Sequence, residues 1–166
     1  ETPTVFRYID WLLTVPLQIS EFYLILSVVN KIPFLLFFKL LGASILMLVF
    51  GYLGETKIIG RLSGFTFGTI AWLYIIYQIF LGEAAQIKKE TTDKSVKFAF
   101  NGLKYIVTIG WAIYPIGYMC MPGGWLSSIM APENVDVWYN LADAINKIGF
   151  GLVVYGIAIS ESKSNK

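Results

Sequence analysis

Four ionisable residues of this 166-residue chain lie deep inside long apolar stretches, where charged side chains are rare. They are Asp10 and Glu21 in the first stretch, and Asp143 and Lys147 in the last. A charge at the centre of a bilayer costs about 2.5 to 3.5 kcal/mol, so such groups normally face the interior of a helix bundle and mark an ion path. The chain has no histidine and a single cysteine, Cys120, so proton chemistry depends on carboxylates, lysine and tyrosine, and no metal site is expected.

The first apolar stretch carries a polar stripe. Asp10 and Glu21 are eleven residues apart, which in a helix is three turns plus about 20° and a rise of roughly 16 Å. Both carboxylates therefore share one face at two depths, with Thr14 between them and Arg7 one turn outward from Asp10. Two carboxylates at separate depths favour a proton relay, whereas a structural polar seam against neighbouring helices is the alternative.

In the last apolar stretch, Asp143 and Lys147 are four residues apart, so their side chains project from one helix face and can pair. A structural salt bridge would explain the pair. An amine shielded from water is more easily held neutral, and a neutral amine is a nucleophile toward an aldehyde. From the lysine alone, both interpretations stay open.

The elements that must position these residues are transmembrane helices. The chain is 56% hydrophobic and 14% charged, whereas soluble domains carry roughly 25% charged residues. A hydrocarbon layer of ~30 Å needs about 20 helical residues. The sequence therefore predicts an all-α membrane protein with one domain, 1–166. Its five spans are 4–29, 34–53, 62–81, 98–119 and 138–159. Pro16 and Pro115 should kink or loosen the first and fourth spans, because proline has no amide donor.

Basic residues orient the bundle, since cytoplasmic loops accumulate lysine and arginine. One side of the bundle carries nine lysines, which are Lys31, Lys39, Lys88, Lys89, Lys94, Lys97, Lys104, Lys163 and Lys166. The opposite side carries only Arg7, Lys57 and Arg61. The C-terminus is predicted to be cytoplasmic and the N-terminal end to lie outside. The net charge of +2 is too mild to indicate a nucleic-acid partner.

Aromatic residues near the polar stripe could form a slot for a flat apolar ligand. The candidates are Trp11, Trp72, Tyr77, Trp111 and Tyr114. Tryptophan and tyrosine near the ends of spans more often belong to interfacial belts. That interpretation is assigned to Tyr74, Trp125 and Trp138.

Three stretches resemble helices three, six and seven of the proteorhodopsins, within the microbial rhodopsin family. The stretches are RYIDWLLTVPLQISEFYLIL from Arg7, GWAIYPIGY from Gly110 and YNLADAINKIGFGL from Tyr139. The resemblance extends over essentially the whole chain. It implies the last five helices of a seven-helix bundle, with the first two helices absent from this chain.

The resemblance also implies a light-driven outward proton pump, which is an ion transporter rather than an enzyme. Lys147 would carry all-trans retinal as a protonated Schiff base, and Asp10 would be the primary proton acceptor. Asp143 would be the second counterion, with Arg7 nearby. Glu21 would return a proton from the cytoplasmic side.

Further positions match residues that flank the polyene of retinal in the family. These positions are Trp11, Met47, Trp111 and Tyr114. Gln18 matches the position that distinguishes green-absorbing members, with leucine, from blue-absorbing members, with glutamine, so blue absorption is expected. An interhelical hydrogen bond without ligand contact is the alternative role for this amide.

Two other functions compete with pumping. A photosensor that signals through a membrane partner needs no fast internal proton donor, so the carboxylate of Glu21 favours a pump. A structural membrane protein would bind no chromophore. The combination of Asp10, Thr14 and Glu21 matches neither the pattern of the sodium pumps nor that of the chloride pumps in the family. The resemblance further implies a multi-pass protein of the inner membrane that forms pentamers or hexamers.

Overall fold

The computed structural model describes residues 3–27, 32–129 and 132–164, and these residues form helices and no strands. The long helices are α1 (Thr4–Ser27), α2 (Phe34–Glu55), α3 (Arg61–Phe80) and α7 (Pro132–Ser164). The shorter ones are α4 (Glu83–Glu90), α5 (Lys94–Tyr105), the π-helical turn η1 (Ile106–Gly110) and α6 (Ile113–Cys120).

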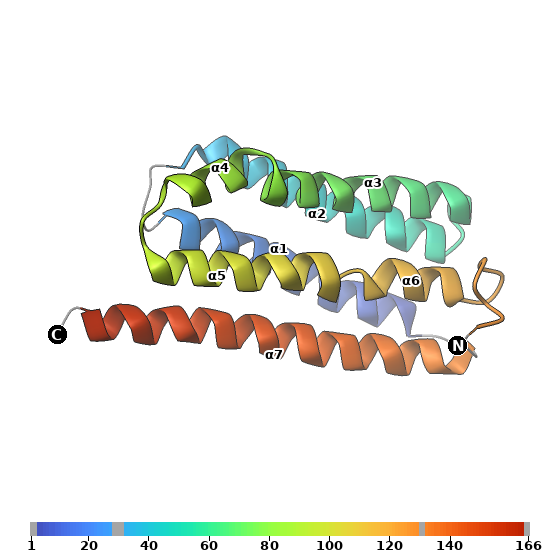
Figure 1. The fold of residues 1–166 in the computed structure, drawn as a ribbon. Helices are drawn as coiled ribbons and strands as arrows, with labels where there is room; N and C mark the ends of the chain where they lie inside the picture. Colours follow the sequence, from blue (N-terminus) through green and yellow to red (C-terminus); the bar gives the residue numbers. More distant parts are fainter. Residues whose placement is uncertain (1–2, 28–31, 130–131, 165–166) are drawn as a thin grey trace.

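The long helices run side by side (Figure 1). In this view α2 and α3 form one side of the bundle and α7 the other, with α1 and the rod made by α5, η1 and α6 between them. α2 packs against both α1 and α3, and α5 packs against α7. The start of α1 and the end of α7 lie at opposite ends of the bundle, as an odd number of crossings requires.

Four helices in the described ranges are long and apolar enough to cross a membrane. They are Thr4–Ser27, Phe34–Glu55, Arg61–Glu90 and Asn134–Ser160. Their outer faces carry large apolar side chains such as Leu13, Phe38 and Leu152, each more than half exposed. In water such faces would be unfavourable, and in lipid they are the expected surface.

The predicted fourth span, 98–119, is divided in the structure into α5, η1 and α6. Pro115 provides a physical reason, because it has no amide to donate to the carbonyl of Trp111. That carbonyl accepts the amide of Tyr114 at 3.1 Å instead, and the amide of Trp111 reaches back to Ile106 at 3.0 Å. The loosening expected near Pro115 is therefore present, whereas α1 continues without interruption through Pro16.

The last helix is longer than the predicted span, which began at residue 138. Starting at Pro132, it includes Asp136, which lies outside the predicted span 138–159. Glu55 lies outside the predicted span 34–53, but it is the final residue of α2. The predicted span 4–29 ends at residues that lie outside the described ranges.

α2 and α3 approach closely at the end of the bundle near Glu55. A Cβ atom on Gly64 would lie 2.6 Å from the Cα atom of Gly54, so only glycine fits there. Small residues at a crossing let two membrane helices pack backbone against backbone. This contact fixes the end of α2 and thereby the position of the Glu55 carboxylate.

Candidate functional site

The side chain of Lys147 lies between two carboxylates. Its Nζ atom is 2.5 Å from Oδ2 of Asp10 on α1 and 3.5 Å from Oδ2 of Asp143 on α7. The predicted pairing of Lys147 with Asp143 across one helical turn is confirmed, and α1 adds a second acid. The lysine and Asp10 side chains are 35% and 45% exposed, because both lie at the edge between α1 and α7.

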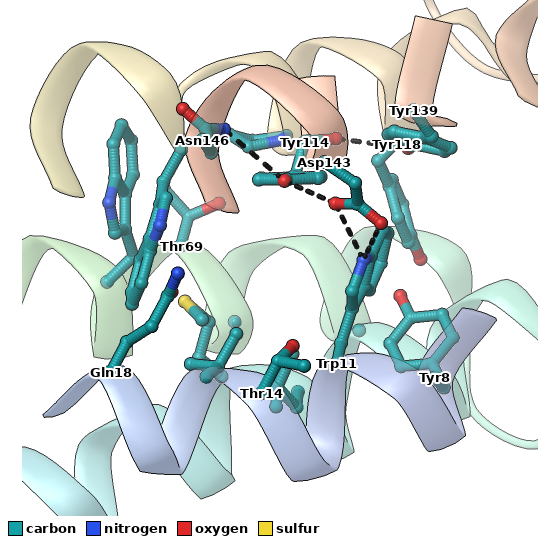
Figure 2. Close-up of a pocket in the computed structure, with 18 of the residues that line it drawn as sticks. Tyr8, Trp11, Thr14, Gln18, Thr69, Tyr114, Tyr118, Tyr139, Asp143 and Asn146 are labelled. Atoms are coloured by element: carbon teal, nitrogen blue, oxygen red, sulfur yellow. Dashed lines mark hydrogen bonds between the residues drawn. The ribbon is translucent and has the colours of Figure 1, made fainter. Parts of the chain in front are cut away.

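Asp143 is held by donors from two neighbouring helices (Figure 2). The indole nitrogen of Trp11 donates to both carboxylate oxygens, at 3.1 and 3.0 Å, and the hydroxyl of Tyr114 donates to Oδ1 at 2.5 Å. The side chain of Asp10, by contrast, contacts only Lys147 among polar groups of the described residues. The carboxylate of Asp143 is therefore fixed in place by hydrogen bonds from Trp11 and Tyr114, whereas that of Asp10 is held by the lysine.

A pocket with a cavity volume of about 100 Å³ extends from Lys147 between α1, α2, α3, α6 and α7. Pockets that bind small molecules have mostly apolar linings with a few polar groups. The predicted residues on its wall are Trp11, Thr14, Gln18, Met47, Trp72, Trp111 and Tyr114. Tyr77 does not belong to this wall, since its side chain is exposed on the outer face of α3. The pocket therefore suits an elongated apolar ligand that ends at the lysine.

Thr14 and Gln18 enter the pocket from α1 and point toward α6 and α7 in Figure 2. Thr14 donates its hydroxyl to the backbone carbonyl of Asp10 at 2.9 Å, so it contacts the helix rather than the carboxylate. Gln18 makes no hydrogen bond to any described residue. The amide of Gln18 is thus free to interact with whatever occupies the pocket.

Glu21 lies apart from this site. Its side chain is exposed, and it makes no hydrogen bond or ion pair with other residues that the structure describes. Glu21 was expected to face the bundle interior. In the described residues it does not, because no described helix covers that edge of α1. The structure thus brings Asp10, Asp143 and Lys147 together but leaves Glu21 about three turns away along α1.

Arg7 belongs to a second ionic cluster at the start of α1. Its guanidinium pairs with Glu55 and, at 2.5 Å, with Asp136, and it lies 4.6 Å from the ring centre of Tyr139. Its partners therefore come from α2 and α7, although Asp10 lies one turn away on its own helix. The side chains of Arg7 and Glu55 are only 6% and 4% exposed. Asp136 lies seven residues before Asp143, and this spacing places both residues on one face of α7.

Asn146 and Tyr139 are also site residues that the sequence analysis did not single out. The hydroxyl of Tyr139 donates to the backbone carbonyl of Tyr114 at 3.1 Å. Asn146 donates to the carbonyl of Gly110 at 3.0 Å and to the hydroxyl of Tyr114 at 3.3 Å. An amide directly before a lysine in an apolar span was the signal for Asn146.

Residues 1–161 match the family model of bacteriorhodopsin-like proteins. The chain belongs to this family. It is 46% identical over 164 residues to a green-light absorbing proteorhodopsin of Gamma-proteobacterium EBAC31A08, covering 99% of this chain and 65% of that protein.

Two solved structures extend the comparison. A blue light-absorbing proteorhodopsin from Med12 is 47% identical with a TM-score of 0.78, over 97% of this chain and 70% of that one. Xanthorhodopsin, described as a light-driven ion pump with dual chromophore, is 29% identical with a TM-score of 0.76, over 97% of this chain and 64% of that one.

The comparisons confirm the resemblance to proteorhodopsins and the all-helical fold. The chain spans 65% of the length of the green-absorbing relative. Green-absorbing and blue-absorbing relatives are equally similar, at 46% and 47% identity, so overall similarity does not decide the colour.

Proposed function

We propose that this chain is the retinal-binding part of a light-driven outward proton pump. One observation carries the proposal: Nζ of Lys147 lies between Asp10 and Asp143 at the end of an aromatic pocket. Membership of the bacteriorhodopsin-like family supports it. All-trans retinal, joined through its aldehyde to Nζ of Lys147, would supply light absorption and the isomerisation that drives transport.

The pocket residues fit this cofactor. Trp11, Trp111 and Tyr114 offer aromatic surface for a flat polyene, and Met47 adds an adaptable side chain on α2. Trp111 is only 4% exposed, so its ring is held firmly in the wall. The two carboxylates at the lysine end would stabilise a positive charge on Nζ.

Asp10 would accept the proton that leaves Nζ of Lys147, over the 2.5 Å contact. Asp143 would be the second counterion, because Trp11 and Tyr114 hold its carboxylate beside Nζ of Lys147. The division of roles thus follows from unequal hydrogen bonding of two acids around one amine. Thr14 would fix the backbone at Asp10 rather than transfer protons itself.

Glu21 would return a proton to Nζ of Lys147 from the other end of α1, and Arg7 would organise the exit side together with Glu55 and Asp136. Protons would then move from the Glu21 end toward the Arg7 end. With the C-terminus in the cytoplasm and the α5, η1 and α6 rod as the fourth of five crossings, this direction is outward. The inner membrane is the proposed location.

We also propose that two further helices cover the edge between α1 and α7. The exposure of Asp10 and Lys147 at this edge supports the idea, because an ion pair facing lipid would be unfavourable. Glu21 lies along the same side of α1 and would be shielded as well. Assembly into pentamers or hexamers is proposed from the family resemblance.

The colour of the pigment is proposed to be blue-absorbing. The position of Gln18 on the pocket wall, without a hydrogen-bond partner among the described residues, supports a contact with the polyene. By the family pattern, glutamine at this position accompanies blue absorption.

The decisive experiment follows external pH while cells that express the full-length protein with retinal are illuminated. Outward pumping predicts acidification outside that requires retinal and disappears with a protonophore. A coloured protein that moves no protons would favour the photosensor instead. A protein that stays colourless after retinal is added would leave only a structural role.

A further inference from the structure

The π-helical turn η1 leaves two backbone carbonyls without their usual amide partners. The amide of Trp111 donates to Ile106 at 3.0 Å, so the carbonyl of Val107 loses the bond of a regular helix. The amide of Tyr114 donates to Trp111 at 3.1 Å, and Pro115 has no amide, so the carbonyl of Gly110 is also released.

Side chains from the pocket wall capture both carbonyls. The indole of Trp72 on α3 donates to Val107 at 3.0 Å, and the amide of Asn146 on α7 donates to Gly110 at 3.0 Å. Asn146 is only 6% exposed, so the bond is shielded from water. The turn is therefore fastened to the helices on two sides of the pocket.

Asn146 has a second contact that leads to the charged centre. Its Nδ2 atom also donates to the hydroxyl of Tyr114 at 3.3 Å. A tyrosine hydroxyl has one hydrogen, and when it accepts from Asn146 that hydrogen is free to point elsewhere. It points to Oδ1 of Asp143, 2.5 Å away. Figure 2 shows this series of hydrogen bonds from Asn146 through Tyr114 to Asp143.

We propose that Asn146 is a positioning residue for Asp143: it orients the Tyr114 hydroxyl toward the carboxylate and couples this bond to the π-helical turn. The inference rests on the proposed function, because it concerns the counterion of the lysine. Lys147 faces Asp143 from the same helix, and Asp10 faces that lysine from α1. Arg7 lies one turn outward on α1, in contact with Asp136.

The test uses the full-length protein with retinal and measures the midpoint pH of its colour change on acidification, which reports protonation of the coupled acids around Lys147. Asn146→Leu keeps the side-chain size and removes the donor. The midpoint should rise by roughly one pH unit, because weakening a hydrogen bond to a carboxylate favours its protonated form.

A second variant reaches the same contact without changing Asn146. A Cβ atom on Gly110 would overlap the carboxamide oxygen of Asn146, so Gly110→Ala should displace that side chain and raise the midpoint similarly. Gly149→Ala is the matched control, because its Cβ atom would meet only Ile106, at an ordinary 3.8 Å. The control should keep the wild-type midpoint.

Coupling through Tyr114 is tested with Tyr114→Phe, alone and combined with Asn146→Leu. If Asn146 acts through this hydroxyl, its substitution should shift the midpoint far less in the Tyr114→Phe background. Equal shifts in both backgrounds, or an unchanged midpoint in Asn146→Leu and Gly110→Ala with only lower thermal stability, would overturn the proposal. In those outcomes the wild-type protein is still coloured and pumps protons. A colourless wild type would instead overturn the proposed function itself.

Discussion

Nζ of Lys147 lies 2.5 Å from Oδ2 of Asp10, although the two residues are 137 positions apart in the chain. The contact joins the first and last long helices, which otherwise pack mainly on α2 and on α5. An amine at this place can exchange a proton with the acid directly, within hydrogen-bond reach.

Lys147→Ala should abolish covalent attachment of retinal. Lys147 is the lysine that lies at the end of the pocket with a carboxylate on either side. Acid denaturation followed by mass spectrometry would reveal whether retinal stays on the protein. Lys104→Ala is the control, since that amine lies against the ring of Phe80 and should leave the colour intact. An adduct on the Lys147→Ala protein would refute the assignment.

Asp10→Asn should stop transport and shift absorption to longer wavelength. Removing the negative charge destabilises the ground state, whose positive charge is near Nζ, more than the excited state, whose charge has moved away. Absorption spectra and light-driven pH changes measure both effects. Glu83→Gln is a suitable control, because Glu83 pairs with Lys39 outside the pocket. Normal pumping with an unchanged spectrum would exclude Asp10 as acceptor.

Glu21→Gln should leave the spectrum nearly unchanged but slow the return of a proton to Nζ of Lys147. Glu21 is about 16 Å from Asp10 along α1, so it is too far to tune the colour strongly. Loss of a positioned proton donor commonly slows transfer by about a hundredfold or more. Flash spectroscopy gives the rate, with Glu90→Gln as control. A wild-type photocycle in Glu21→Gln would count against a pump and for a sensor.

Arg7→Gln should lower the free energy of unfolding by about 3 kcal/mol, because it leaves the carboxylate of Glu55 buried without its partner. The double variant Arg7→Gln with Glu55→Gln should recover much of the loss. Thermal unfolding measured by circular dichroism compares them. Lys39→Gln, which breaks a more exposed pair, should have a much smaller effect. A double variant no more stable than Arg7→Gln would show that the pair itself is not the cause.

The sequence predicted the long helices and the pairing of Asp143 with Lys147 because both depend on local spacing, and the helix period relates residues within one helix. The pocket position of Met47 on α2 was expected from the family resemblance, and Met47 lines the pocket together with Trp11 and Gln18.

The partners of Arg7 required the three-dimensional packing. Sequence spacing placed Arg7 next to Asp10, but its guanidinium extends to Glu55 on α2 and Asp136 on α7. The π-helical turn was equally hidden, because it is stabilised by side chains of Trp72 and Asn146 from other helices. Such contacts arise between elements far apart in the chain, and no local pattern reports them.

The last prediction concerns Gln18 and the colour of the pigment. Light moves positive charge in retinal away from the lysine, so a fixed amide dipole along the polyene affects the two electronic states unequally. Gln18 lies on the pocket wall, eight residues after Asp10. If its dipole favours the ground-state charge distribution, the energy gap between the ground and excited states of retinal is widened. Gln18→Leu should therefore move the absorption maximum to longer wavelength and leave proton transport intact.

The spectra must be compared at a pH where Asp10 is ionised in both proteins, because its protonation also changes the colour. Gln78→Leu is the matched control: this amide is buried, and it contacts Tyr74 and the backbone of Glu83 instead of the pocket. Its substitution should leave the maximum in place. If Gln18→Leu likewise leaves the maximum in place, Gln18 does not tune the pigment, and the proposal of blue absorption loses its physical basis.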